Sequence, residues 1–164
     1  YEPRLVLLTG AAGGVAPGVE LGDLVLAEAV YHLHGRQAEG RFPCDPEYLA
    51  LAWRAAEVAP LRPIRNRSPK VLEAGVATAG GVVRSRPWGE HVAREHGILA
   101  AEMEGAAVAG VCAEYGVPFL AIRSISDVIG RRWQWLTMIR YLVPAQRNAE
   151  RLVFSLVQML GEET

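Results

Sequence analysis

Short runs of consecutive apolar residues, separated by segments with helical spacing, constrain the fold of this chain more than any other feature. Residues 5–8 and 119–122 are such runs, typical of strands that are buried on both faces of a sheet. Asp45-Pro46-Glu47 predicts a helix start, because an aspartate N-cap, a proline in the first turn and a following acid all favour one. This alternation predicts the α/β class, with a mixed central sheet flanked by helices.

The remaining pattern fills in the same architecture over one domain, residues 1–164, which is long enough to bury a core. Further strands are expected in residues 22–31, 70–79 and 98–101, and further helices in residues 88–96 and from about 104 to 115. Residues 9–14 are expected to form a tight turn and residues 35–43 a polar loop. An amphipathic terminal helix is expected from Pro144.

Composition and charge exclude several classes of function. The net charge of −1 gives no reason to expect nucleic acid or an anionic membrane as a partner, and no apolar run approaches the ~20 residues of a membrane span. The two cysteines, Cys44 and Cys112, cannot form a disulfide framework, so a reducing, cytoplasmic setting is expected. His32 and His34 share a face of an extended segment, but nothing nearby completes a metal site, and we expect no metal and no cofactor.

Carboxylates at predicted strand ends are the strongest signal of a site. Glu102 and Glu104 flank Met103 at a predicted strand-to-helix switch, and Asp127 ends the next apolar strand. Such groups are costly to bury unless something satisfies them, and in α/β sheets ligands bind beyond the carboxyl ends of the strands. The segment at Gly10 and the loop at residues 80–81 fall at strand ends by the same reading. We therefore expect all four elements to meet at one edge of the sheet.

Four motifs, in this order along the chain, resemble those of the purine nucleoside phosphorylase and nucleosidase superfamily. The likeness is greatest to the 5′-methylthioadenosine/S-adenosylhomocysteine nucleosidases, and it extends over nearly the whole chain. The motifs are Thr9-Gly10-Ala11-Ala12-Gly13-Gly14, Gly22-Asp23, Glu102-Met103-Glu104-Gly105-Ala106 and Ser124-Ile125-Ser126-Asp127.

The resemblance implies a role for each matching residue. Glu104 corresponds to the carboxylate that holds both ribose hydroxyls, and Met103 to the side chain that packs on the sugar. Asp127 corresponds to the acid that protonates or hydrogen-bonds N7 of the purine, with Ser126 beside it. Glu102 corresponds to a second acidic position of the motif. Residues 10–13, Gly10 and Ala11 among them, correspond to the loop near the ribose and the attacking nucleophile.

The same resemblance exposes departures. The family begins with an earlier strand and a loop whose glutamate activates the attacking water, so the chain, which opens at Tyr1, is expected to be truncated at its N-terminus relative to the family. Ala11 stands where a serine is frequent, and Val83 where a phenylalanine stacks on the purine. Leu8 stands where the trimeric phosphorylases have an arginine that binds phosphate.

The function expected from these matches is hydrolysis of the N-glycosidic bond of an adenine-type nucleoside, with release of the purine. Two alternatives stay open: a phosphate-dependent phosphorylase, and a catalytically incomplete module that only binds nucleosides. The resemblance also implies a homodimer, since the family supplies part of the pocket rim across a subunit interface. The partner of the site is then a small purine nucleoside.

Overall fold

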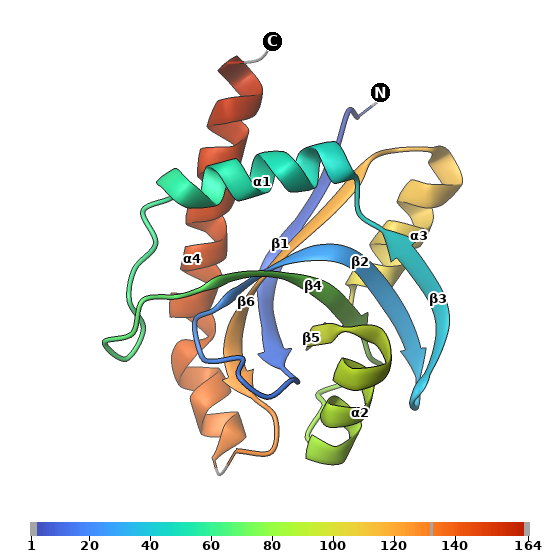
Figure 1. The fold of residues 1–164 in the computed structure, drawn as a ribbon, viewed down its shortest axis with the longest axis vertical. Coiled ribbons are helices and arrows are strands. Elements are labelled where there is room, and N and C mark those ends of the chain that lie inside the picture. The colour runs from blue at the N-terminus through green and yellow to red at the C-terminus, as the bar shows by residue number, and fades with distance from the viewer. Residues whose placement is uncertain (1–2, 132, 163–164) are drawn as a thin grey trace.

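The chain is represented by a computed structural model that describes residues 3–131 and 133–162, so Tyr1 lies outside the described residues. Three strands come first, and helices and strands alternate after them (Figure 1). The strands are β1 (Val6–Gly14), β2 (Leu24–His34), β3 (Gln37–Pro43), β4 (Val71–Thr78), β5 (Ile98–Glu102) and β6 (Phe119–Val128). The helices are α1 (Pro46–Val58), α2 (Arg86–His96), α3 (Gly105–Tyr115) and α4 (Gln134–Glu162).

All six strands belong to one mixed sheet in the order β3-β2-β4-β5-β1-β6. The β1–β6, β2–β4 and β4–β5 pairs are parallel, whereas β1–β5, β2–β3 and β2–β6 are antiparallel. Because β6 also pairs with β2, five of the strands close into a ring and β3 extends β2 on the outside. The α/β class and the mixed sheet with flanking helices are therefore confirmed.

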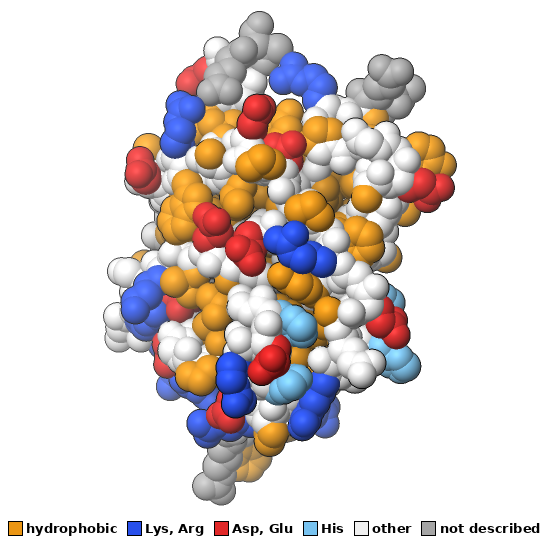
Figure 2. Space-filling model, turned by 45° about the vertical axis from the view of Figure 1, so that its right-hand side comes forward, with side chains coloured by type: hydrophobic (Ala, Val, Ile, Leu, Met, Phe, Trp, Pro, Cys, Tyr) orange, Lys and Arg blue, Asp and Glu red, His pale blue; other side chains and the backbone are white. Residues whose placement is uncertain are grey.

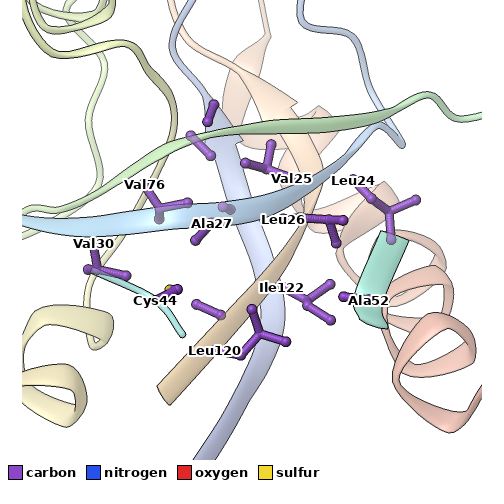
Figure 3. Close-up of a cluster of buried hydrophobic side chains, with 14 of the residues drawn as sticks. Leu24, Val25, Leu26, Ala27, Val30, Cys44, Ala52, Val76, Leu120 and Ile122 are labelled. Carbon is purple, nitrogen blue, oxygen red and sulfur yellow. The ribbon is translucent and has the colours of Figure 1, made fainter. Parts of the chain in front are cut away.

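The core lies between the crossing strands and the helices packed on them (Figure 3). Leu24 and Leu26 of β2 and Leu120 and Ile122 of β6 are fully buried, and Ala52 of α1 closes the cluster from the helix side. This core fixes β6 as a central strand, with nine of its ten residues buried. The acidic end of β6 thereby continues a strand that is buried along almost its whole length.

Helix boundaries follow the predicted local signals. Asp45 is the N-cap of α1 and accepts hydrogen bonds from the backbone N–H groups of Glu47 and Tyr48 at 2.9 and 3.2 Å. Gly97 and Gly116 end α2 and α3 in the left-handed conformation that glycine favours. The helix start predicted at Asp45 and the helices predicted at residues 88–96 and 104–115 are confirmed within a few residues.

Three predictions about irregular segments are wrong. Residues 9–14 continue β1 rather than forming a turn, because each pairs with β6 as far as Gly14. Residues 35–43 are mostly strand β3, antiparallel to β2, joined to it by a turn at Gly35. The last helix begins at Gln134 instead of Pro144, and Pro144 lies inside it. In each case, tertiary pairing or packing outweighs the local preference for a break.

Strand β1 is less covered than its sequence predicts. Residues 6–11 are half-buried, and along this stretch β6 is the strand partner within the described part of the chain. The expectation that residues 5–8 are buried on both faces is therefore wrong here. Within residues 3–131 and 133–162, no helix is long and apolar enough to cross a membrane, α4 included.

Candidate active site

A cavity opens where β5 and β6 end and where the second half of β1 passes between them, with α4 on the far wall. Seven of the eight residues singled out from the sequence line it: Ala11, Val83, Glu102, Met103, Glu104, Ser126 and Asp127. These residues come from segments far apart in the chain. The expectation that the motifs meet at one edge of the sheet is thus met by the geometry.

Gly10 is the exception, because it does not line the cavity. A Cβ atom on Gly10 would lie 2.8 Å from Nη1 of Arg123, the residue opposite it on β6. Glycine at this position leaves room for the Arg123 guanidinium. Its role in the structure is therefore to admit a neighbouring side chain rather than to contact the cavity.

Glu102 is buried, and its carboxylate is occupied by the protein itself. It accepts hydrogen bonds from the backbone N–H groups of Glu104 at 3.1 Å and Gly105 at 2.8 and 2.9 Å, and from the Thr78 hydroxyl. It also forms a buried ion pair with Arg123. Since helix N-termini carry unsatisfied N–H groups and partial positive charge, Glu102 acts as the anionic cap of α3. Glu102 therefore supports the site. The resemblance predicts that it binds substrate, but both of its carboxylate oxygens already accept hydrogen bonds from the protein.

Arg123 is a site residue that the sequence reasoning missed. It is 3% exposed, and its Nε atom has no hydrogen-bond partner within the described residues. Its charge is balanced by Glu102 rather than left available for an anion. The available signal was a single arginine in the otherwise uncharged run of residues 117–126, a position where a charge needs a buried partner.

Glu104 and Met103 project from the turn that follows β5. Glu104 is the N-cap residue of α3 by position, yet its side chain makes no capping hydrogen bond, because Glu102 and the Thr78 hydroxyl take the first helical N–H groups. Both side chains line the cavity and are exposed. An acid at this position that is not used as a helix cap remains available to accept hydrogen bonds from a ligand.

Asp127 is the most deeply buried ionisable residue that lines the cavity, with 3% of its surface exposed against 6% for Glu102. Burial raises the pKa of its carboxyl group, while hydrogen bonds from Gln134 and Ser126 oppose that rise. The raised pKa is what a carboxylic acid needs if it is to hold a proton for transfer. The side chain packs against Gly13, where a Cβ atom would lie 3.5 Å from Oδ2.

Gln134 is the second missed residue. Its Nε2 donates to Oδ2 of Asp127 at 2.8 Å and to the Val83 carbonyl at 3.0 Å, and its Oε1 accepts from the Gly130 N–H at 3.3 Å. Gln134 lies in the first turn of α4, ahead of the residue at which the sequence placed the helix start. The misplaced helix start is why the sequence reasoning did not find it.

The same face of α4 supplies the apolar wall. Met138 and Leu142 follow Gln134 at intervals of four residues and both line the cavity. Residues four apart share one face of a helix. One face of α4 therefore places the Gln134 amide against Asp127 and two apolar side chains beside it. With Met103 and Val83, this gives the cavity an apolar lining around three carboxyl groups.

The Gly22-Asp23 motif lies apart from the cavity. Asp23 is fully buried and accepts hydrogen bonds from the Arg67 side chain and the Lys70 backbone, at 2.6 and 2.8 Å, so it anchors a loop. His32 and His34 both lie near Glu39, at 3.8 and 3.2 Å. Among the described residues there is no cluster of three or more metal-ligating side chains.

Fold and site together define an α/β protein with a buried, raised-pKa acid facing an apolar cavity that has a second, unengaged carboxylate at its rim. Residues 1–154 match the profile of the phosphorylase superfamily. The chain belongs to that superfamily.

Two curated relatives are similar over almost the whole chain. Both are 5′-methylthioadenosine/S-adenosylhomocysteine nucleosidases. The protein from Psychromonas ingrahamii is 31% identical over 98% of this chain and 72% of its own length. The protein from Hydrogenovibrio crunogenus is 33% identical over 98% of this chain and 71% of its own length.

Solved structures share the fold. The nucleosidase from Colwellia psychrerythraea, in complex with adenine, superposes with a TM-score of 0.79 at 24% identity, over 94% of this chain and 66% of its own. The futalosine hydrolase of Helicobacter pylori strain 26695 gives 0.77 at 25% identity, over 95% and 68%. This chain thus spans about two thirds of the Colwellia chain.

Proposed function

We propose that this chain hydrolyses the N-glycosidic bond of an adenine-type nucleoside, such as methylthioadenosine or adenosylhomocysteine, and releases the purine. The observation that carries the proposal is a buried Asp127, with its pKa raised by desolvation, in the same cavity as the unengaged Glu104. Membership of the superfamily and the nucleosidase relatives support it. Because these relatives are named for methylthioadenosine and adenosylhomocysteine, we also propose a role in methionine salvage.

The reaction assigns one task to each side of the cavity. As the bond between ribose and base breaks, its electron pair goes to the base and positive charge develops on the sugar. Protonated Asp127 gives its proton to the departing purine, at N7, and becomes a carboxylate. Water supplies the hydroxyl of the free sugar and releases the proton that restores the acid.

Glu104 and Met103 are proposed to hold the sugar. A carboxylate can accept both vicinal hydroxyls of ribose, and its negative charge favours the sugar as it becomes cationic. A thioether fills the apolar face of the ring without competing for hydrogen bonds. Val83 and Ser126 are proposed to lie on the side of the base, and Ala11 near the ribose and the attacking water; all three line the cavity.

Electrostatics favour water over phosphate as the second substrate. Arg123 directly precedes the Ser124-Ile125-Ser126-Asp127 motif and is buried, and its charge is already neutralised by Glu102. A phosphate dianion needs uncompensated positive charge, which this pairing withholds. The phosphorylase alternative therefore has less support than hydrolysis.

One observation favours a second candidate, a nucleoside-binding module without turnover. Of the three carboxyl groups on the cavity wall, Glu102 is engaged as a helix cap, Glu104 faces the proposed sugar site and Asp127 the base. Within the described residues the cavity wall therefore has no further carboxylate to activate water.

Product analysis distinguishes the three activities. The purified protein is incubated with methylthioadenosine, adenosylhomocysteine, adenosine and inosine, with and without phosphate, and free base is measured. We expect base release that does not depend on phosphate. Release only with phosphate identifies a phosphorylase. Binding by calorimetry without any product identifies a binding module, and that binding must be lost in Glu104→Ala.

We further propose that two copies assemble as a homodimer in the cytoplasm. An apolar row on α4 supports the dimer: Trp135, Leu136, Ile139, Leu142 and Val143 are all exposed. Leu142 also lines the cavity, so a second copy seated on this row would reach the rim of the site. The two buried free cysteines support a reducing compartment.

A further inference from the structure

The network around Asp127 treats its two carboxyl oxygens differently. Oδ2 faces the Gln134 amide at 2.8 Å, and Oδ1 faces the Ser126 hydroxyl at 2.9 Å. An amide nitrogen can only donate, whereas a hydroxyl can donate or accept. The two neighbours therefore place different limits on where a proton can sit.

The orientation of the Gln134 amide is fixed by its other contacts. Its oxygen accepts from the Gly130 N–H at 3.3 Å, and its nitrogen donates to the Val83 carbonyl at 3.0 Å as well as to Asp127. Turning the amide over would set its oxygen against two acceptors and its nitrogen against a donor. The hydrogen-bond network thus determines the assignment of N and O. Oδ2 of Asp127 is consequently held as an acceptor in both protonation states.

Ser126 provides the complementary freedom. Its hydroxyl lies 2.9 Å from Oδ1 of Asp127 and 3.3 Å from the Ala12 carbonyl, and its single proton can serve only one of them at a time. When Asp127 is ionised, Ser126 donates to Oδ1. When Asp127 is protonated, Ser126 donates to Ala12 and can accept the proton on Oδ1.

We propose that Gln134 is a positioning residue that keeps Oδ2 of Asp127 as a permanent acceptor, so that the proton given to the leaving base is carried on Oδ1. This inference rests on the proposed function for its use in catalysis, although the placement of the proton does not require substrate. Gln134 itself is not among the residues that line the cavity. It acts through Asp127 and also ties the loop at Val83 to the acid.

No other charged group among the described residues takes over the role of Gln134 at Oδ2 of Asp127. Glu102 is tied to Arg123 and the start of α3, Glu104 lies at the rim, and Arg131 after β6 pairs with Glu20 at 2.7 Å. The neighbours on β1 are the glycine and alanine residues 11–13, which carry no charge. Removing the Gln134 donor should therefore act on the ionised form of Asp127, which it stabilises.

Carbon NMR on aspartate labelled at the side-chain carboxyl carbon tests this directly, because the chain has only three aspartates, Asp23, Asp45 and Asp127. Asp127→Asn assigns the third signal. In Gln134→Met, which keeps the side-chain length but not the amide, we expect the midpoint for Asp127 to move up by about one pH unit, the change for losing a hydrogen bond to a charged acceptor. The alkaline limb of base release should move with it.

Gln146→Met is the matched control, since Gln146 lies on the same helix and its amide donates to the exposed Glu150, at 3.0 Å. It should leave the midpoint unchanged. If Gln134→Met is unfolded by circular dichroism, Gln134→Glu is used, and a larger upward movement is expected because a second carboxylate then faces Oδ2. An unmoved midpoint in a folded variant overturns the proposal. Absence of base release with a moved midpoint instead counts against the proposed function alone.

Discussion

At the scale of single residues, Asp127 combines burial with two hydrogen-bond donors, and the balance between them decides its protonation. Burial raises the pKa of the carboxyl group above its ordinary value of 3.8, and the Gln134 and Ser126 bonds limit the rise. The sequence could predict an acid at the end of a buried strand. It could not predict this balance, because Gln134 reaches Asp127 only through the docking of α4 on β6.

The sign of the pH effect on stability follows from that shift. The folded protein holds the Asp127 proton more tightly than the unfolded chain does, so this contribution to the free energy of unfolding is complete below the unfolded pKa and is lost as pH rises through the folded pKa. Because asparagine does not ionise, Asp127→Asn does not lose this stability as the pH rises. We expect the variant to be more stable than the parent at pH 7, with the difference shrinking in acid, as measured by urea unfolding at a series of pH values. A parent that is more stable than the variant at pH 7 would contradict the raised pKa.

A second residue-scale prediction concerns Glu104. Glu104→Ala removes the acceptor proposed for the ribose hydroxyls, and hydrogen bonds to charged groups contribute about 1.5–3 kcal/mol each. Calorimetric affinity for methylthioadenosine should fall by at least about tenfold, while the melting temperature stays near that of the parent, because Glu104 makes no capping bond. Unchanged affinity would remove Glu104 from the site.

At the scale of elements, the start of α3 shows what local sequence can and cannot predict. The change from strand to helix at residues 102–105 was predictable, as was the end of α3 at Gly116. Local sequence could not predict which of the two glutamates caps α3. Glu102 is held in that position by Arg123 on β6 and Thr78 on β4, which are both distant in sequence. Segments 9–14 and 35–43 were misassigned for the same reason, since pairing with other strands decides them.

The matched pair Glu102→Gln and Glu104→Gln tests this division. Glu102→Gln leaves the Arg123 guanidinium buried without a charged partner, which typically costs 3–5 kcal/mol. Glu104→Gln alters an exposed side chain that makes no capping hydrogen bond, and it should change the free energy of unfolding by less than about 0.5 kcal/mol. Denaturant unfolding of both variants measures the contrast. Equal losses would show that Glu102 is not the support of α3.

At the scale of the whole molecule, positive and negative side chains are interspersed on the face drawn in Figure 2, with apolar side chains between them. The apolar row on α4 is a more continuous feature, and it leads into the cavity through Leu142. Light scattering should give the mass of two chains. In Ile139→Glu, a charge in the middle of the row should shift the population toward monomer, whereas Gln146→Glu on the same helix should not. A monomeric parent protein would contradict the homodimer.

The chain spans about 72% of the length of the curated relatives that it matches. The described residues include those proposed to hold the sugar and to protonate the base, which lie on or next to β5, β6 and α4. The proposed function requires that Asp127 deliver a proton to a leaving purine.

The most direct measurement is therefore the rate of adenine release from methylthioadenosine, in phosphate-free buffer, by the parent protein and by Asp127→Asn. Asparagine keeps the size of the side chain but cannot transfer a proton, so we expect substrate binding to persist in calorimetry and turnover to fall at least ~100-fold. An Asp127→Asn variant that releases adenine as fast as the parent would contradict the central claim that Asp127 is the acid of a nucleoside hydrolase.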